Sequence, residues 1–545
     1  MALTKLERSD LRSRLFRHLD GIVTAPTVFT LFQSGIIDHL ISQKSCGLAS
    51  LSEKFSCNEG YLNVALRVLC SQGWLTQQVE GAGEDISFQV TEKGVIAFKY
   101  LDLYESSVKF IPYAIKLENF IQDGFDPESY RQLRILIEQQ KNQYGIDPTD
   151  DPTEKDVQDQ ILNHIEGLIA GPLIVSLGIN GMFHRYFSLA PFKTEEFSRH
   201  HEQMKTIVDL FAFLGWFSEK NGIFNFTDKG LFYAKRASAY GVTVSYLPTF
   251  MHLRELIFGD PNILWNKPEG SPELHVDRSM NVWGSGGAHT TYFQKIDEII
   301  IELFDKPIED QPIGFTDMGC GNGALLVHIF EVIWTKTARG KMLSEHPLFI
   351  VGSDYNEAAL SATRDTLNQA GIWAKVVWGD IGNPDLLANQ LKENYDINLG
   401  DLLNVRSFLD HNRVYSEPQK TGTPISLSSG AFAFRGKRIN NTEVVDNLVE
   451  HLGKWTPYVQ KFGLLLIELH TIPPQLAAEN IGKTAVTAYD ATHGFSDQYI
   501  VELDCFLKAA AAAGLHPVPA FQTKYPDSDL ATISINVFKS AEYME

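Results

Sequence analysis

The chain has 545 residues, too many for one ordinary domain, so we expect two to four domains. A hydrophobic fraction of 44% and an aromatic fraction of 11% are enough to form buried cores, and they exclude a disordered protein. The net charge of −20 argues against nucleic acid and anionic membranes as main partners, because both attract clustered Lys and Arg.

The cysteine pattern and the N-terminal stretch indicate the compartment. The five cysteines are scattered and odd in number, so the sequence predicts neither a disulfide framework nor a paired-cysteine zinc site, and it favours a reducing environment. Residues 1–16 are charged throughout and lack the apolar centre of a signal peptide. We find no apolar run that approaches the roughly 20 residues of a transmembrane helix. We therefore expect a cytoplasmic protein without a membrane partner.

Two stretches in the first half of the chain resemble each other. Residues 66–75 (LRVLCSQGWL) and 208–217 (VDLFAFLGWF) both have an apolar helical face that ends in Gly-Trp. Each is followed by a short strand pattern and by Thr-acid-Lys-Gly, at residues 91–94 and 227–230. A helix, a Gly-Trp turn, a hairpin and a capped helix predict a winged helix, so we expect two degenerate copies. The region of the first copy that would contact DNA has one arginine, which favours a dimerisation or lid module.

The chain between these copies is predicted to be mostly helical. Residues 147–160 are acidic, and we expect an exposed loop that enters a helix. Residues 166–183 are apolar but broken by several glycines and a proline, so they predict a buried helix with close contacts and not a membrane span. The four regions that we expect are a winged-helix-like unit at 1–105, a helical connector or lid at 106–190, a second winged-helix-like unit at 191–275 and an α/β core at 276–545.

From about residue 299 strands alternate with helices, which predicts a doubly wound, Rossmann-like parallel sheet. Residues 313–333 combine a short apolar strand, a glycine turn and an amphipathic helix. Gly319, Gly321 and Gly323 allow a tight turn and a close approach of a ligand to the backbone. The same spacing fits the dinucleotide fingerprint, which is a weak signal by itself.

Three acids at successive strand ends favour S-adenosylmethionine over a dinucleotide. Asp317 precedes the glycines, where a carboxylate suits the ammonium group of the methionine part and would repel a pyrophosphate. Asp354 ends the next strand and can accept hydrogen bonds from both ribose hydroxyls. Asp380 ends the third strand and can bind the adenine amino group, while Ile381 packs on the adenine ring. The sequence thus predicts a class I methyltransferase core that binds S-adenosylmethionine.

Further features of the core agree with this prediction. Tyr355 directly follows Asp354 and is a candidate cofactor contact. Tyr292 lies on the segment that enters the core, where it either closes over the methionine end of the cofactor or belongs to a flexible linker. Residues 517–540 predict two strands around a polar loop, the terminal antiparallel hairpin typical of class I methyltransferases.

The reacting centre is predicted at the ends of the fourth and fifth strands, residues 401–405 and 462–470. Ligands of such sheets lie beyond the carboxyl ends of the strands, so polar residues that follow these strands should converge. We expect Ser496 to cap the next helix and to place Gln498 in its first turn. The side chains expected to meet there are Asp410, His411, His470, His493 and Gln498.

This group of side chains allows two chemistries. Two histidines with a carboxylate and an amide form a ligand set for Fe(II) or Mn(II), and the lack of cysteine disfavours structural zinc. Alternatively, only one of these groups acts, as a base. In O-methyltransferases of this architecture a histidine usually follows the fourth strand, but the corresponding residue here is Leu409, with Asp410 and His411 just after it. That displacement argues against O-methylation by a lone histidine.

Five longer motifs resemble one family. They are NVWGSGGAHTTYF (281–293), RSFLDHNR (406–413), SSGAFAFRGKRI (428–439), LLLIELH (464–470) and HGFSDQY (493–499). Together with the helical first half, they resemble the metal-dependent methyltransferase domain of GNAT-type polyketide synthase loading modules, such as those of apratoxin and saxitoxin assembly.

The resemblance implies a function. It implies a mononuclear metal, Fe(II) before Mn(II), and C-methylation of a malonyl unit on the phosphopantetheine arm of an acyl carrier protein, with other polyketide synthase domains as further partners. A divalent cation on the two carbonyl oxygens would lower the pKa of the α-proton. The candidate catalytic residues are His411, His470 and Arg406, and the candidate metal ligands are the five side chains of the predicted reacting centre.

Basic residues near this centre have two interpretations each. Arg406 and Arg413 either bind a substrate carboxylate or pair with local acids. Arg435, Lys437 and Arg438 either hold a phosphopantetheine phosphate or an acidic carrier protein, or belong to a solvated loop.

Two alternative hypotheses about the function of the chain remain open. In the first, the chain is a small-molecule O-methyltransferase with a histidine base. In the second, it is a winged-helix regulator that binds a nucleotide-like ligand without catalysis.

Overall fold

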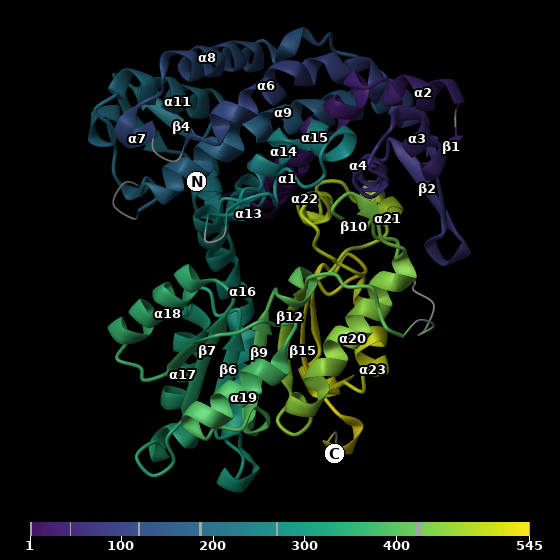
Figure 1. The fold of residues 1–545 in the computed structure, drawn as a ribbon. Coiled ribbons are helices and arrows are strands. Elements are labelled where there is room, and N and C mark those ends of the chain that lie inside the picture. Colours follow the sequence, from purple (N-terminus) through teal and green to yellow (C-terminus); the bar gives the residue numbers. More distant parts are fainter. Residues whose placement is uncertain are drawn as a thin grey trace.

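The computed structural model of the chain consists of a helical half and a sheet half (Figure 1). It describes residues 3–43, 45–117, 120–184, 188–268, 271–420, 422 and 428–543, and for 82, 286–291, 293 and 294 the backbone alone. Helix α16 (Arg278–Phe304) runs from one half to the other. It packs on α13 (Ala237–Ser245) so closely that a Cβ on Gly284 would lie 2.6 Å from the backbone nitrogen of Val242. A glycine is therefore required where α16 leaves the helical half.

Two long helices, α1 (Lys5–Gln33) and α9 (Pro152–Ile179), form the centre of the helical half. A Cβ on Gly21 would lie 2.1 Å from the Cα of His164, so glycine is needed at this crossing. The predicted buried helix with close contacts is confirmed, and α9 continues through its glycines and Pro172. By length and composition α9 could span a membrane, but 83% of its apolar window is buried, as in the core helix of a folded domain.

The two similar stretches form units of related architecture. In the first, α4 (Glu59–Ser71) leads into a three-stranded sheet in the order β1-β3-β2. In the second, α11 (His201–Phe213) leads into the two-stranded sheet β4-β5. The strands are β1 (Ser45–Gly47), β2 (Leu75–Glu80), β3 (Asp85–Val90), β4 (Phe217–Lys220) and β5 (Ile223–Phe226).

Matching threonine caps show the repeat in atomic detail. Thr91 Oγ1 donates to the carbonyl oxygen of Gly73 at 2.7 Å and caps α5 (Glu92–Ala97). Thr227 Oγ1 donates to the carbonyl oxygen of Gly215, also at 2.7 Å, and caps α12 (Asp228–Ala234). The structure thus confirms the predicted pair of winged-helix-like units.

Further helices of this half are α2 (Ile36–Gln43), α3 (Leu48–Phe55), α6 (Glu105–Ala114), α7 (Phe120–Asp123), α8 (Pro127–Lys141), α14 (Leu247–Met251) and α15 (Leu253–Phe258).

The sheet half contains a doubly wound sheet with the strand order β13-β15-β12-β9-β6-β7-β8, and β14 also pairs with β15. The strands are β6 (Gly314–Met318), β7 (Phe349–Asp354), β8 (Lys375–Trp378), β9 (Leu402–Ser407), β12 (Leu464–Leu469), β13 (His516–Pro517), β14 (Thr523–Tyr525) and β15 (Ile533–Lys539). The five strands from β8 to β12 in this order are parallel, whereas β15 is antiparallel to β12. The predicted sheet with its terminal antiparallel strands is confirmed.

Helices cover both faces of this sheet (Figure 1). On one face the core contains Ile296, Leu326 and Leu360, from α16, α17 (Ala324–Lys336) and α18 (Glu357–Gln369). The other core contains leucines of α19 (Pro384–Tyr395) and α20 (Asn441–Val459), together with Phe506 of α23 (Leu503–Ala512). Because both faces are buried, the parallel strands are rich in apolar residues, and the polar residues on them require a specific partner.

Insertions beyond the ends of β9 and β12 pack against α4 of the helical half. They are β10 (Ala433–Phe434), β11 (Lys437–Arg438), α21 (Pro474–Glu479) and α22 (Val486–Gly494). The predicted helix cap at Ser496 is wrong, because α23 begins at Leu503 and the Ser496 hydroxyl donates back to the carbonyl oxygen of Thr492 at 2.6 Å. Ser496 and Gln498 therefore lie in a loop at the contact between the two halves.

Candidate active site

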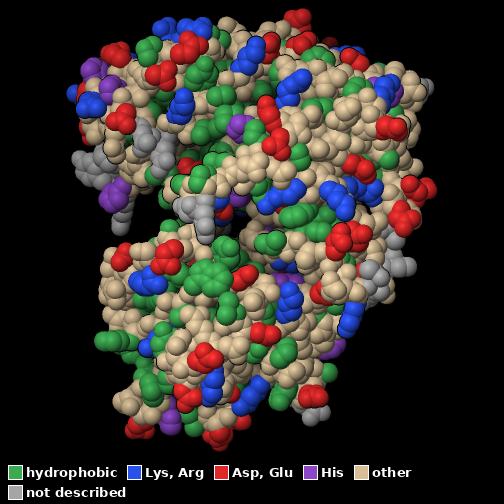
Figure 2. All heavy atoms as spheres, viewed as in Figure 1, with side chains coloured by type: hydrophobic (Ala, Val, Ile, Leu, Met, Phe, Trp, Pro, Cys, Tyr) green, Lys and Arg blue, Asp and Glu red, His purple; other side chains and the backbone are tan. Residues whose placement is uncertain are grey.

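The glycine turn after β6 has the left-handed conformation that glycine adopts without strain. Gly319, Gly321 and Gly323 have φ values of 74°, 56° and 79°. A Cβ on Gly319 would lie 2.9 Å from the side chain of Leu409, which follows the adjacent strand β9. The turn therefore faces the end of β9, and Figure 2 shows a hollow between the two halves of the molecule, on the left of the view.

Asp317 at the end of β6 is a buried carboxylate with an unused acceptor. Its side chain is 2% exposed, and Oδ1 has no hydrogen-bond partner within the described part of the chain. Burial, with a contribution from the charge of Asp354, raises the pKa of Asp317 well above its ordinary value. A cation placed beside this carboxylate would remove that penalty. The residue thus fits the ammonium group of S-adenosylmethionine.

Asp354 and Asp380 follow the next two strands. Asp354 Oδ2 accepts a hydrogen bond from the backbone nitrogen of Gly321 at 3.1 Å, and burial raises the pKa of Asp354. Asp380 Oδ1 accepts from the backbone nitrogen of Gly382 at 2.7 Å. The carbonyl oxygen of Ile381 accepts from Trp455 Nε1 at 2.8 Å, which fixes the backbone beside Asp380. Since β6, β7 and β8 are neighbours in the sheet, the structure places the three predicted acids along one edge.

The two predicted aromatic contacts lie at different places. Tyr355 is 70% exposed, and its ring lies 5.3 Å from the ring of Trp378, measured between centroids. Tyr292 on α16 packs between Tyr525 and Phe408, at centroid distances of 5.2 and 6.3 Å. Tyr292 is thus near the end of β9, whereas Tyr355 directly follows Asp354 at the end of β7.

His411 belongs to a buried pair with Glu468. The turn that begins at Asp410 directly after β9 places His411 Nδ1 2.6 Å from Glu468 Oε1 on β12. The backbone nitrogens of Asp410 and Leu469 donate to the same carboxylate, at 2.9 and 2.7 Å. A carboxylate at Nδ1 fixes the imidazole tautomer, so that Nε2 carries the lone pair.

His493, in the last turn of α22, faces the ring of His411. The two ring centroids are 4.9 Å apart, with an interplanar angle of 74°. His493 Nδ1 lies 2.8 Å from the carbonyl oxygen of Tyr489, so this histidine is also held through Nδ1. Burial, helped by the nearby His411, lowers the pKa of His493 to about 3. His493 is therefore neutral at physiological pH.

Gln498 completes this group with its side-chain amide. Nε2 donates to the hydroxyl oxygens of Ser496 and Tyr246, at 3.0 and 3.1 Å. Oε1 is buried and has no partner within the described residues. Gln498 and His493 both line a small cavity of about 10 Å³, close to the size that holds one water molecule. The structure thus brings His411 and His493 together, with Gln498 in the loop that follows α22.

Two of the predicted ligands are not brought to this group. Both ring nitrogens of His470 face protein atoms, with Nε2 2.8 Å from Ser534 Oγ and Nδ1 3.3 Å from the carbonyl oxygen of Val501. Asp410 Oδ1 lies 2.9 Å from His451 Nε2 and 3.0 Å from Arg406. Although burial alone raises the pKa of Asp410, the charge of Arg406 and the bond to His451 lower it. The backbone of Asp410 supports Glu468, while its side chain belongs to a separate buried ion pair.

Among the described residues, no group of three or more His, Cys, Asp or Glu side chains could hold a metal ion. The expectation of five ligands therefore does not fit this structure.

Neither predicted substrate arginine faces the hollow. Arg406 is fully buried, with its guanidinium 4.6 Å from the ring centroid of Trp455. Arg413 donates to Asn447 Oδ1 and to the carbonyl oxygens of Asp410 and Val444. Arg413 is therefore a structural part of the core beside β9, whereas the catalytic role of Arg406 stays a prediction.

The arginines of the basic insertion (residues 435–438) are bonded to other residues of the chain. Arg435 donates to Asp497 Oδ2 at 2.8 Å and stacks on Trp265, and Arg438 donates to Glu59 at 3.2 Å. Lys437 is the exposed member of the three, 3.7 Å from Glu417. These contacts hold the insertion against the helical half, so the carrier-binding interpretation lacks a free pair of arginines.

Sequence reasoning missed Glu468 and Tyr246. Glu468 carried a signal, since an acid inside the apolar stretch of residues 464–469 requires a buried partner. Tyr246 lies between α13 and α14 of the helical half, and no local pattern connects it with Gln498, which is far away in the sequence. Its role depends on how the two halves pack.

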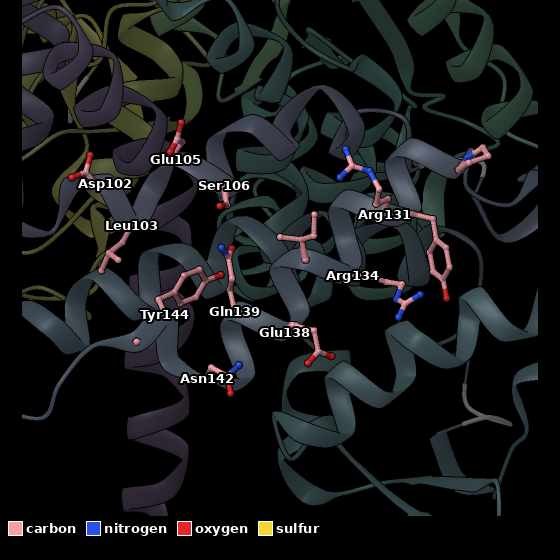
Figure 3. Close-up of a pocket in the computed structure, with 14 residues that line it drawn as sticks. Asp102, Leu103, Glu105, Ser106, Arg131, Arg134, Glu138, Gln139, Asn142 and Tyr144 are labelled. Carbon is pink, nitrogen blue, oxygen red and sulfur yellow. The ribbon is translucent and has the colours of Figure 1, made fainter.

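A separate groove of about 920 Å³ lies in the helical half, between α6 and α8 (Figure 3). Tyr144, Gln139 and Arg134 are among the side chains that line it. None of the predicted site residues contributes to this groove. The candidate active site is therefore the polar group at the strand ends.

Three family models match the chain. Residues 273–536 match the AprA MT2-like domain, residues 11–77 match the AprA N-terminal domain, and residues 166–260 match the AprA winged helix domain. Together they account for most of the chain, in both halves. Among curated protein sequences, none matches this chain significantly.

Solved methyltransferases are similar to the chain in outline. The mitomycin 7-O-methyltransferase MmcR has 11% identity and a TM-score of 0.41, over 71% of this chain and 98% of its own. The CurJ carbon methyltransferase has 11% identity and a TM-score of 0.31, over 80% and 99%. The trans-methyltransferase CalH, in complex with SAH, has 11% identity and a TM-score of 0.35, over 80% and 91%. Since these TM-scores are below 0.5, the family assignment depends on the sequence matches.

Proposed function

Since this chain belongs to the AprA-type methyltransferases, with the N-terminal, winged-helix and MT2-like domains of that family, we propose that its S-adenosylmethionine-dependent reaction is a C-methylation. The proposed substrate is a malonyl-type acyl group on the phosphopantetheine arm of an acyl carrier protein. The proposed role is the synthesis of a polyketide starter unit, in the cytoplasm and beside other polyketide synthase domains.

The group of His411, His493 and Gln498 is the observation that supports this proposal. Methylation at carbon requires removal of an α-proton, and an unassisted carbon acid does not release one near neutral pH. His411 is oriented by Glu468 at 2.6 Å and presents its other ring nitrogen, as a general base requires. The amide oxygen of Gln498 and the neutral ring of His493 add two uncharged groups that can donate an electron pair.

The same side chains would hold a divalent metal. His411 and His493 are each fixed through Nδ1, which leaves Nε2 for coordination, and Gln498 offers an oxygen. Nitrogen and amide oxygen ligands without cysteine suit Fe(II) or Mn(II). When bound, such a metal would polarise the dicarbonyl oxygens and lower the pKa of the α-proton. His470 and Asp410 are not part of this proposal.

A small-molecule O-methyltransferase is the second candidate. The His411–Glu468 pair favours it as well, because an oriented histidine can remove a hydroxyl proton without a metal. In this candidate His411 is the base, since both nitrogens of His470 face protein atoms.

The hypothesis of a DNA-binding regulator has less support. Helix α4 of the first winged-helix-like unit is buried along nearly its whole length, from Gly60 to Ser71, against α21, α22 and β11. A helix covered in this way has no free face for a DNA groove.

The test is methyl transfer to malonyl-loaded carrier protein, followed by mass spectrometry. We expect a product that is heavier by one methylene per transfer when S-adenosylmethionine and Fe(II) or Mn(II) are present. Full activity in EDTA would remove the metal from the proposal. Methylation of a hydroxyl compound, without any transfer to the carrier-bound malonyl group, would favour the second candidate.

A further inference from the structure

The loop that contains Gln498 is held by tyrosines of the helical half. This loop, residues 494–498, is here called the site loop. Tyr61 on α4 donates to Asp497 Oδ1 at 2.7 Å, and the Tyr246 hydroxyl accepts from Gln498 Nε2 at 3.1 Å. Tyr61 lies within the match to the N-terminal domain, and Tyr246 within the match to the winged helix domain. Each of the two helical domains therefore contributes one hydroxyl to the same loop.

The hydrogen bonds of Ser496 determine which way the Gln498 amide points. The Ser496 hydroxyl has one hydrogen, and that hydrogen is used in the 2.6 Å bond to the carbonyl oxygen of Thr492. Ser496 Oγ can therefore only accept from Gln498, so the amide nitrogen must be on this side. Nε2 then has one further hydrogen, which the Tyr246 hydroxyl oxygen accepts. Oε1 is left without a partner within the described residues, and Gln498 and His493 both line the same small cavity.

Tyr246 is buried at the contact with the site loop. Its side chain is buried, with 3% exposed, at the junction of α13 and α14. Its ring lies near those of His493 and His275, at centroid distances of 6.0 and 6.3 Å. Burial raises the pKa of the Tyr246 hydroxyl, so it stays protonated at physiological pH. The ring packs at the contact of the two halves, and the hydroxyl faces the site loop.

We infer that Tyr246 is a positioning residue of the active site. Its hydroxyl holds the Gln498 amide so that Oε1, and not Nε2, is the atom left without a protein partner, and the winged-helix domain is thereby a structural part of the reacting centre. This inference rests on the proposed function for the meaning of Gln498, but the geometry of the tether is independent of the substrate.

The experiment compares two single hydroxyl deletions in the full-length protein. Tyr246→Phe removes the tether and keeps the ring. Tyr240→Phe is the matched control, because Tyr240 is also fully buried in the same domain and its hydroxyl lies 2.7 Å from His18 Nδ1, a residue of α1. Both variants lose one buried hydrogen bond, so a general loss of stability affects both.

The first measurement is hydrogen exchange of peptides that cover the site loop. The backbone nitrogens of Ser496 and Gln498 both donate to the carbonyl oxygen of His493, so their exchange reports whether the loop is held. We expect about fivefold faster exchange in Tyr246→Phe, the effect of one lost hydrogen bond, and no change in Tyr240→Phe. Unchanged exchange in Tyr246→Phe, or an equal increase in both variants, would overturn the inference.

The second measurement is methyl transfer to malonyl-loaded carrier protein. We expect kcat of Tyr246→Phe to fall about tenfold at an unchanged KM for S-adenosylmethionine, as for other residues that orient an active-site group. Tyr240→Phe should keep the wild-type kcat. A wild-type enzyme without activity on this substrate would refute the proposed substrate, and the exchange result would then decide the inference on its own. Faster exchange with unchanged kcat would also overturn it.

Discussion

The two sides of the candidate active site are built in different ways. On the cofactor side, Asp317, Gly321 and Asp354 come from neighbouring strands and turns of one parallel sheet. On the reacting side, His411 and His493 meet across 4.9 Å from separate insertions, and the amide of Gln498 is fixed by Tyr246 from the helical half. The first side therefore depends on sheet topology alone, and the second depends on how the domains pack.

This difference has a consequence for the role of the helical half. Changes on the reacting side should affect turnover and leave cofactor binding intact, whereas changes on the cofactor side should do the reverse. The winged-helix-like units then act on chemistry through tethers such as those of Tyr61 and Tyr246, without contact to the cofactor acids.

The largest expected effect is on the reacting side. His411→Ala should lower kcat about 10³-fold, because it removes an oriented base or ligand, while the Kd of S-adenosylmethionine stays within about twofold. His470→Ala is the control, since His470 is equally buried but bonded to Ser534 and Val501. It should cost about 2 kcal/mol of stability, because the buried bonds to Ser534 and Val501 are lost, and retain most of its turnover. Kinetics and calorimetry check both, and equal kcat losses would break the distinction between the two histidines.

A smaller effect is expected on the cofactor side. Asp317→Asn should raise the Kd of S-adenosylmethionine about 30-fold, because a charged hydrogen bond to the ammonium group is lost. At saturating cofactor, kcat should stay within about threefold of wild type. Asp365→Asn, which removes an exposed charge from α18 in the same half, serves as control and should bind as wild type does. A large kcat loss in Asp317→Asn at saturation would show that the two sides are coupled.

The pH dependence of cofactor binding sharpens the same contrast. The pKa of Asp317 is raised in the unliganded protein by burial, so at low pH the carboxyl is protonated and cannot attract an ammonium group. The affinity for S-adenosylmethionine should therefore increase as pH rises through this raised pKa, by less than the 30-fold of the substitution. For stability the sign is opposite: the folded state keeps a proton that the unfolded state releases above about 3.8, so this group's contribution is lost as pH rises. Titration calorimetry at several pH values should show this rise in S-adenosylmethionine affinity in the wild type and an affinity that does not change with pH in Asp317→Asn.

The sequence predicted that the three acids lie along one edge of the sheet, and it did so for a physical reason. A strand that ends in an acid, followed by a glycine turn, is a local pattern, and the parallel order of β6, β7 and β8 brings such ends together. The Gly-Trp turns and threonine caps of the winged-helix-like units were predictable in the same way, because each lies within one short segment.

The reacting side was harder to predict because proximity there depends on side-chain direction. His470 and Glu468 lie on consecutive parts of the same segment, yet Glu468 faces His411 while His470 faces Ser534 on β15. The same is true of Asp410 and His411, which are neighbours in sequence and have different partners. A pattern of residue types cannot assign such directions without the packing around them.

The smallest expected effect concerns the second tether of the site loop. Tyr61→Phe removes the 2.7 Å bond to Asp497, which still keeps its contact with Arg435. Burial raises the pKa of Asp497 to about 6, and the Tyr61 bond opposes that rise. In the variant, the Asp497 carboxyl should therefore titrate at a higher pH. We expect a stability loss of about 1 kcal/mol and a kcat about threefold lower, less than for Tyr246→Phe, because Gln498 keeps its own tether. Tyr104→Phe, which removes another buried hydroxyl bonded to a histidine, is the control for thermal unfolding and should leave kcat unchanged. A kcat loss larger than that of Tyr246→Phe would mean that the N-terminal domain, and not the winged-helix domain, sets the geometry of the reacting side.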